Sequence, residues 1–304
     1  MKSFTGAFTA LITPFDDEGQ MDQEGLIHLI RRQIKNGIDG LVVLGTTGEA
    51  PTLTKEEKKL IIEVAKKECH ERTTFIIGTG SYSTRQAIED TLSAELAGAD
   101  AALIVTPYYN RPTQEGLYQH FKAIAHATNL PIIIYNIAGR TGQNMQTETL
   151  ARLLEIPAIV GIKEASGNIS QINDVIHLTK AVRPDFSVLS GDDALTLPMM
   201  ALGGDGVISV ISNVFPLEVK NLVESISGGD FELAREIHFR LMPMVKLAFM
   251  ETNPIPIKAM HRLFDLPAGV CRLPLCGLSR ENALKLQEEL LALISKNIAY
   301  PKLA

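Results

Sequence analysis

The chain has 304 residues, of which 45% are hydrophobic and 21% charged, so it can bury a large core and is neither a disordered nor a collagen-like polymer. Its net charge of −6 is spread without blocks, which argues against nucleic acid or an anionic membrane as a partner. We expect a cytoplasmic protein for three reasons. The three cysteines form no Cys-x-x-Cys pair, no apolar run is long enough to cross a bilayer, and no secretory leader is visible.

Short apolar, β-branched runs recur along the chain, and a segment of helical length follows each one. Their nearly continuous hydrophobicity is typical of parallel strands that are buried on both faces. The eight predicted strands are Phe8–Ile12, Gly40–Leu44, Thr74–Ile77, Ala101–Thr106, Ile132–Tyr135, Ile159–Lys163, Phe186–Leu189 and Val207–Val210.

Helix signals lie between these strands. Thr54 with Glu57, and Ser83 with Gln86, have the spacing of a capping box at a helix start. Eight βα units predict an α/β fold, a closed (β/α)8 TIM barrel. The alternative, a doubly wound open sheet, usually has about five or six strands and would leave two units unplaced.

The strand signals stop near residue 225, and the remaining residues read as helices interrupted by prolines. We therefore expect a catalytic barrel over residues 1–224 and a small helical domain over residues 225–304.

Active sites of such barrels lie at the carboxyl ends of the strands, so polar residues at those ends deserve inspection. Lys163 closes the sixth apolar run. Burial there would lower the pKa of its amine and leave a neutral nucleophile able to form an imine with a ketone. The alternative interpretation is a strand-end lysine paired with an acid such as Glu164.

Two further strand ends carry candidate groups. Tyr135 closes the fifth run, where its phenol could move protons at a carbinolamine or simply pack, and Arg140 in the next loop suits a substrate carboxylate. After the second run, the hydroxyls and amides of Thr46 and Thr47 between glycines could cradle a carboxylate.

Metal chemistry has little support in the sequence. The seven histidines show no His-x-His or His-Glu-x-x-His spacing, and Asp192-Asp193 lacks further candidate ligands nearby. We expect no metal site.

Four segments at successive predicted strand ends resemble a known family. They read Gly45-Thr46-Thr47-Gly48-Glu49, Thr106-Pro107-Tyr108-Tyr109-Asn110-Arg111-Pro112, Tyr135-Asn136 with Arg140-Thr141-Gly142, and Gly161-Ile162-Lys163-Glu164-Ala165. On these segments the chain resembles the dihydrodipicolinate synthase family of the pyruvate-dependent class I aldolase superfamily, and the similarity runs along the whole chain.

The resemblance implies a lyase that condenses pyruvate with L-aspartate 4-semialdehyde to give 4-hydroxy-tetrahydrodipicolinate, the first committed step of diaminopimelate and lysine biosynthesis. It implies no cofactor beyond the covalent imine of Lys163 with pyruvate. It also implies that the hydroxyls of Tyr135, Thr46 and Tyr109 form a proton relay. Thr47 is expected to bind the pyruvate carboxylate, and the Ile208 carbonyl to face the pyruvate. Arg140 is expected to bind the carboxylate of the aldehyde in a pocket that Gly191 lines.

Family members are usually tetramers built from tight dimers, in which the residue matching Tyr109 reaches into the neighbouring site. The resemblance therefore implies a homotetramer, a dimer of dimers, with small-molecule substrates and neither nucleic acid nor membrane as a partner.

The chain departs from the family pattern in two places. Ala138 stands where the family usually has proline, which would make the Arg140 loop more flexible. In addition, Lys55 and Lys58 stand where lysine-inhibited bacterial relatives carry histidines, and Gln86 where they carry a glutamate. We expect this protein to be insensitive to lysine, because the site gains cations and loses a counter-charge.

Two other functions are compatible with the barrel. A lyase or aldolase for a sugar-derived 2-keto acid, such as N-acetylneuraminate, would share the lysine and the strand-5 tyrosine, but a polyol calls for hydroxyl-binding side chains where this chain has Arg140 and the Tyr108-Tyr109 pair. The other is a catalytically idle barrel that only binds a metabolite. Such a protein would not need all the candidate catalytic residues, and this chain has all of them.

Overall fold

The computed structural model describes residues 3–295. Eight parallel strands in chain order form a closed barrel, which confirms the TIM barrel and excludes the doubly wound open sheet. The strands are β1 (Gly6–Ala10), β2 (Gly40–Val43), β3 (Thr74–Gly78), β4 (Ala101–Val105), β5 (Ile132–Asn136), β6 (Ile159–Glu164), β7 (Ser187–Ser190) and β8 (Gly206–Ser209).

Every predicted strand is present, and its ends differ from the prediction by two residues at most. All residues of β2, β5, β6, β7 and β8 are buried, as the continuous apolar runs indicated. Strands covered on both faces cannot alternate polar and apolar residues, which explains the strength of the sequence signal.

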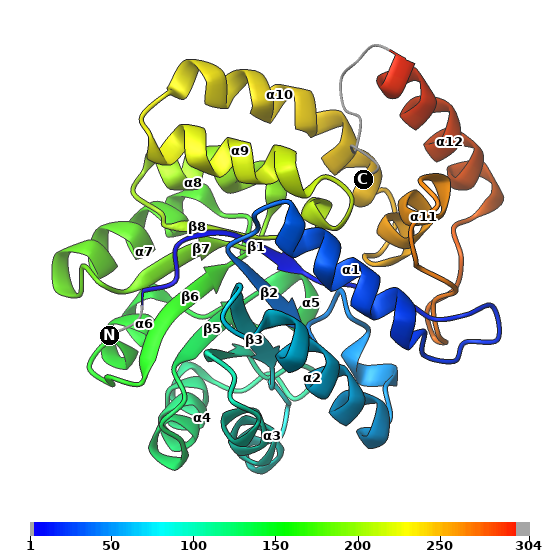
Figure 1. Ribbon diagram of the computed structural model, residues 1–304. Coiled ribbons are helices and arrows are strands. Elements are labelled where there is room, and N and C mark those ends of the chain that lie inside the picture. Colours follow the sequence, from blue (N-terminus) through cyan, green and yellow to red (C-terminus); the bar gives the residue numbers. More distant parts are fainter. Residues whose placement is uncertain (1–2, 296–304) are drawn as a thin grey trace. The chain divides into compact units, whose positions relative to one another are not determined.

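Helices follow the strands in chain order (Figure 1). They are α1 (Gln23–Lys35), η1 (Ala50–Thr52), α2 (Lys55–Cys69), α3 (Thr84–Ala97), α4 (Gln114–Ala127), α5 (Ala138–Thr141), α6 (Thr147–Leu153), α7 (Ile169–Val182), η2 (Asp193–Leu195), α8 (Thr196–Ala201), η3 (Ile211–Asn213), α9 (Pro216–Ser227), α10 (Phe231–Ala248), α11 (Ile255–Leu263) and α12 (Arg280–Ser295).

One predicted capping box is complete and the other is half formed. At α2, Thr54 accepts from the Glu57 amide, and the Glu57 carboxylate accepts from the Thr54 amide. At α3, Ser83 accepts from the Gln86 amide, but the Gln86 side chain donates to Asp90, one turn further along. A helical i,i+4 partner competes with the backbone for this side chain.

The chain divides into two compact units. Within the described residues, the first comprises 3–6 and 74–208, and holds β3 to β7, β8 as far as Ile208, and the helices between these strands. The second comprises 7–73 and 209–295; in it α1 packs on α2, and α9 to α12 pack in succession (Figure 1).

The domain boundary expected at residue 225 falls inside α9, and the helices after it belong to the same compact unit as β1 and β2. The division into residues 1–224 and 225–304 therefore stays a prediction. Within the described part of the chain, no helix combines the length and hydropathy needed to cross a membrane.

Candidate active site

Lys163 and Tyr135 lie side by side at the carboxyl ends of neighbouring strands in the first unit. The two residues are direct register partners between β5 and β6, and the Lys163 Nζ lies 4.2 Å from the centre of the Tyr135 ring. Both side chains are buried. The structure thus brings together the two residues to which the sequence assigned imine chemistry.

Burial changes the charge state of the lysine. The pKa of Lys163 is lowered from an ordinary value of 10.5 to about 7, because desolvation penalises the ammonium form. The negative charge of Asp193 partly opposes the shift, and the positive charge of Arg140 adds to it. A large share of this amine is therefore neutral and nucleophilic near neutral pH.

Glu164 is not the partner of Lys163. Its carboxylate accepts from the Ser166 amide at 2.6 Å and from the Asn136 side chain at 3.0 Å. Successive side chains of a strand point to opposite faces, which separates residues 163 and 164. The interpretation of Lys163 as one half of a simple strand-end ion pair with Glu164 is wrong. Asp193, buried in η2, is instead the acid whose charge acts on the lysine. The sequence suggested it only as a weak candidate for a metal ligand, next to Asp192.

Tyr135 keeps its proton at neutral pH. Burial raises the pKa of its phenol to about 12, while the nearby Arg140 charge lowers it slightly and Asp192 raises it. A protonated phenol beside a neutral amine can donate to an oxygen atom that leaves a carbinolamine.

Gly191 lies against the lysine side chain. A Cβ atom at this position would be 3.0 Å from Cε of Lys163 and 2.7 Å from Cβ of Ala165. Glycine is therefore required for the lysine to take its present path. Ile208, the next-to-last residue of β8, is buried in the same unit.

The Arg140 segment is a short helix. Residues Ala138–Thr141 form α5, which ends at Gly142 in a left-handed conformation. The Gly142 amide donates to the Ala138 carbonyl at 2.9 Å. Arg140 itself is exposed, and its charge reaches both Lys163 and Tyr135. Ala138 thus takes part in regular hydrogen bonding; the flexibility expected from the missing proline stays a prediction.

A polar network joins Asn136 at the end of β5 and Glu164 on β6, both buried, to the half-buried Asn144 and Gln171, and sequence reasoning did not predict it. The Asn136 side chain donates to Asn144 at 2.9 Å and to Glu164 at 3.0 Å, and its Oδ1 accepts from the Met145 amide. Asn144 in turn donates to Gln171 at 2.7 Å. The bonded pairs are separated by 8, 27 and 28 residues, which is neither a helical nor a strand spacing, so no spacing rule could have found them.

Tyr109 lies at an exposed loop tip. Its side chain is 91% exposed and its φ is +71°, a conformation that few non-glycine residues adopt. The preceding Tyr108 packs edge to face on Tyr82, with ring centres 5.5 Å apart. The loop therefore holds Tyr109 exposed on the surface of the chain.

Thr46 and Thr47 belong to the second unit, directly after β2. Thr47 is buried, and its hydroxyl accepts from the Asn253 side chain at 2.9 Å. A hydroxyl whose oxygen already accepts a hydrogen bond keeps its own proton for donation to an anion. This geometry suits the carboxylate-binding role implied for Thr47.

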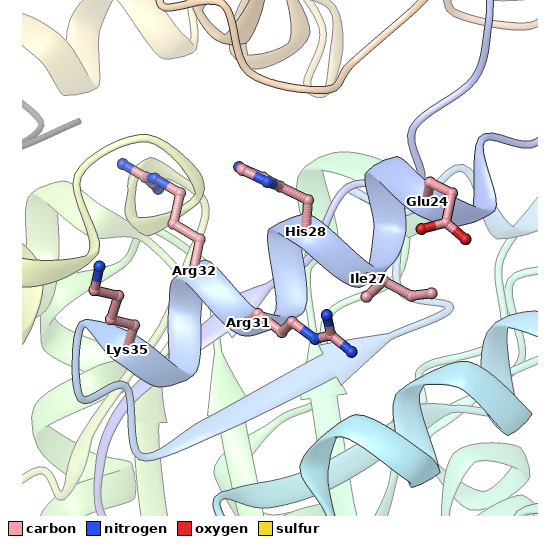
Figure 2. Close-up of a pocket in the computed structure, with 6 residues that line it drawn as sticks. All are labelled: Glu24, Ile27, His28, Arg31, Arg32 and Lys35. Atoms are coloured by element: carbon pink, nitrogen blue, oxygen red, sulfur yellow. The ribbon is translucent and has the colours of Figure 1, made fainter. Parts of the chain in front are cut away.

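A hollow with a volume of about 430 Å³ lies along α1, away from these residues in the chain. Figure 2 shows its lining residues, all from that one helix, with His28 and Arg32 pointing to one side and Arg31 to the other. Arg31 pairs with Glu68 at 2.9 Å, and Arg32 donates to backbone carbonyls. These basic groups therefore anchor α1, and we assign them no ligand.

Among residues 3–295, no cluster of three or more His, Cys, Asp or Glu could hold a metal ion.

A closed α/β barrel with a buried, strand-end lysine facing a tyrosine defines the class of this protein as a (β/α)8 barrel with a candidate imine-forming site. The chain belongs to the dihydrodipicolinate synthetase family, whose model matches residues 3–293.

Known relatives agree with this assignment. A protein from Protochlamydia amoebophila named 4-hydroxy-tetrahydrodipicolinate synthase is 59% identical, over 93% of this chain and 94% of its own length. Dihydrodipicolinate synthase from Thermotoga maritima has a similar structure, with a TM-score of 0.94 and 42% identity over 98% of this chain and 100% of that one. The enzyme from Cyanidioschyzon merolae, solved with lysine bound, has a TM-score of 0.91 and 42% identity over 96% and 99% of the two chains.

Proposed function

We propose that this protein is a 4-hydroxy-tetrahydrodipicolinate synthase, which condenses pyruvate with L-aspartate 4-semialdehyde in diaminopimelate and lysine biosynthesis. The observation that carries the proposal is the buried Lys163 amine beside Tyr135 in a chain of this family. The relatives named above bear the synthase name, which favours this reaction over cleavage of a sugar-derived 2-keto acid.

The reaction begins at the lysine. The neutral Lys163 nitrogen attacks C2 of pyruvate, and the former carbonyl oxygen leaves as water, protonated through Tyr135 and the hydroxyls of Thr46 and Tyr109. A methyl proton is then lost, and the resulting enamine carbon bonds to the aldehyde carbon of the second substrate, whose oxygen becomes the 4-hydroxyl. The substrate amine finally attacks the imine carbon, which closes the ring and releases Lys163.

The remaining residues bind the substrates. Thr47 donates to the pyruvate carboxylate, the Ile208 carbonyl faces the pyruvate, and Arg140 binds the carboxylate of the aldehyde beside Gly191. The lysine serves as the electron sink through its imine, so the chemistry requires no resident cofactor or metal.

The protein works as a cytoplasmic homotetramer, a dimer of dimers, in this proposal. Support comes from Tyr109, which is 91% exposed and can complete the hydroxyl relay of a neighbouring subunit. Activity is expected to fall on dissociation; a monomer that keeps full activity would contradict the shared relay.

A coupled assay tests the function. Product is expected from pyruvate with aspartate semialdehyde and not from N-acetylneuraminate. Borohydride with pyruvate is expected to inactivate the enzyme by reducing the imine, and peptide mapping should find the adduct on Lys163. An adduct on another lysine would overturn the assignment.

A further inference from the structure

The loop after β2 ends at a buried and strained acid. Glu49 has φ +52° and ψ +34°, the left-handed region that non-glycine residues rarely adopt, and its side chain is fully buried. Such a conformation persists only where the surroundings hold it. Since Glu49 closes the segment that carries Thr46 and Thr47, its contacts decide how firmly that segment is held.

Glu49 is held by α11 and by the loop that follows it, all within the second unit. Its carboxylate lies 2.5 Å from Nζ of Lys258 on α11, and it accepts from the Arg272 amide at 3.0 Å. Lys258 is itself buried, donates to the Val270 carbonyl at 2.9 Å and lies 4.2 Å from the centre of the Phe15 ring.

The same stretch of chain contacts the loop a second time. Asn253, directly before α11, donates to the Thr47 hydroxyl at 2.9 Å. Within the loop, the Glu49 amide donates to the Thr46 carbonyl at 3.1 Å. A shift of Glu49 would therefore be passed to both threonines by covalent and hydrogen-bonded links.

We propose that Glu49 and Lys258 are positioning residues for pyruvate binding: their buried ion pair fixes the segment Gly45–Glu49 so that Thr46 and Thr47 meet the substrate, and α11 is thereby part of the pyruvate site. This inference rests on the proposed function, from which the roles of the two threonines come. A purely structural ion pair would instead support the fold without affecting one substrate more than the other.

The chain offers a matched control. Lys220 pairs with Asp39 at 2.7 Å in the same unit, and Asp39 directly precedes β2, at the strand end opposite to the loop. Lys220→Met removes the same charge from an ion pair that has no contact with Thr46 or Thr47 in the hydrogen bonds described.

The experiment compares Lys258→Met, the double variant Glu49→Gln with Lys258→Met, and Lys220→Met with the wild type. The double variant leaves no unpaired buried charge, so it remains testable if Lys258→Met does not fold. The measurements are the pyruvate concentration that half-saturates borohydride trapping, the KM for aspartate semialdehyde, and amide hydrogen exchange of residues 45–49.

In the double variant we expect the half-saturating pyruvate concentration to rise by about tenfold or more, because a small misplacement of a binding group is costly. The KM for the aldehyde should stay within about twofold, and exchange should accelerate in the loop. Lys220→Met should change none of the three.

An unchanged pyruvate dependence in the double variant, or a parallel loss for both substrates, would overturn the proposal. Failure of the wild type itself to trap pyruvate would overturn the proposed function instead, and loop exchange alone would then decide whether the pair positions the segment.

Discussion

Replacing Lys163 with methionine should stabilise the protein, by an amount that depends on pH. The pKa of Lys163 is about 7 in the folded protein, against an ordinary value of 10.5. Below pH 7 the buried amine is charged in both states, and the folded state carries the full cost of desolvating it. Methionine has a similar length and no charge to desolvate.

The magnitude follows from linkage. Because the folded pKa is lowered, the unfolded chain binds more protons between pH 7 and 10.5, and wild-type stability rises with pH through this window. Removing the amine should therefore stabilise the protein by about 5 kcal/mol at pH 6 and by about 2 kcal/mol at pH 9.

Urea unfolding of the wild type and Lys163→Met at fixed protein concentration measures this difference at both pH values. Lys59→Met is the control, since the Lys59 side chain is 79% exposed on α2 and should give almost no difference at either pH. A stability gap that is equal at pH 6 and pH 9, or no gap at all, would refute the desolvation argument. The same amine should make pyruvate trapping in the wild type increase with pH through about 7.

Further predictions concern single substitutions and lysine. Tyr135→Phe should lower kcat about 100-fold to 10,000-fold with little change in the pyruvate KM, and a loss under about threefold would favour a packing role. Arg140→Ala should raise the KM for aspartate semialdehyde while pyruvate trapping continues; parallel loss of trapping would contradict this. Gly191→Ala should slow trapping, because the new Cβ lies 3.0 Å from Cε of Lys163, and a wild-type rate would count against it. Lysine at millimolar concentration should leave initial rates unchanged, since Lys58 stands where sensitive relatives have histidine; half-inhibition below about 1 mM, with the Cyanidioschyzon merolae enzyme as a comparison, would show the charge argument to be wrong.

The sequence by itself determined the barrel and the position of its chemistry along the chain. Strands buried on both faces must be apolar throughout, so each was visible as a run, and consecutive parallel strands bring their last residues to one end. That is why Lys163 and Tyr135 could be singled out before their register pairing was known.

The tertiary structure decided what surrounds those residues. The low dielectric that shifts the pKa of Lys163, the direction of Glu164 away from it and the contact with Gly191 all depend on packing between distant segments. The same holds for the Glu49–Lys258 pair, whose members lie in different parts of the chain. Residues that become neighbours only when the chain folds show no regular spacing in the sequence. Their hydrogen bonds and their burial therefore cannot be predicted from sequence patterns.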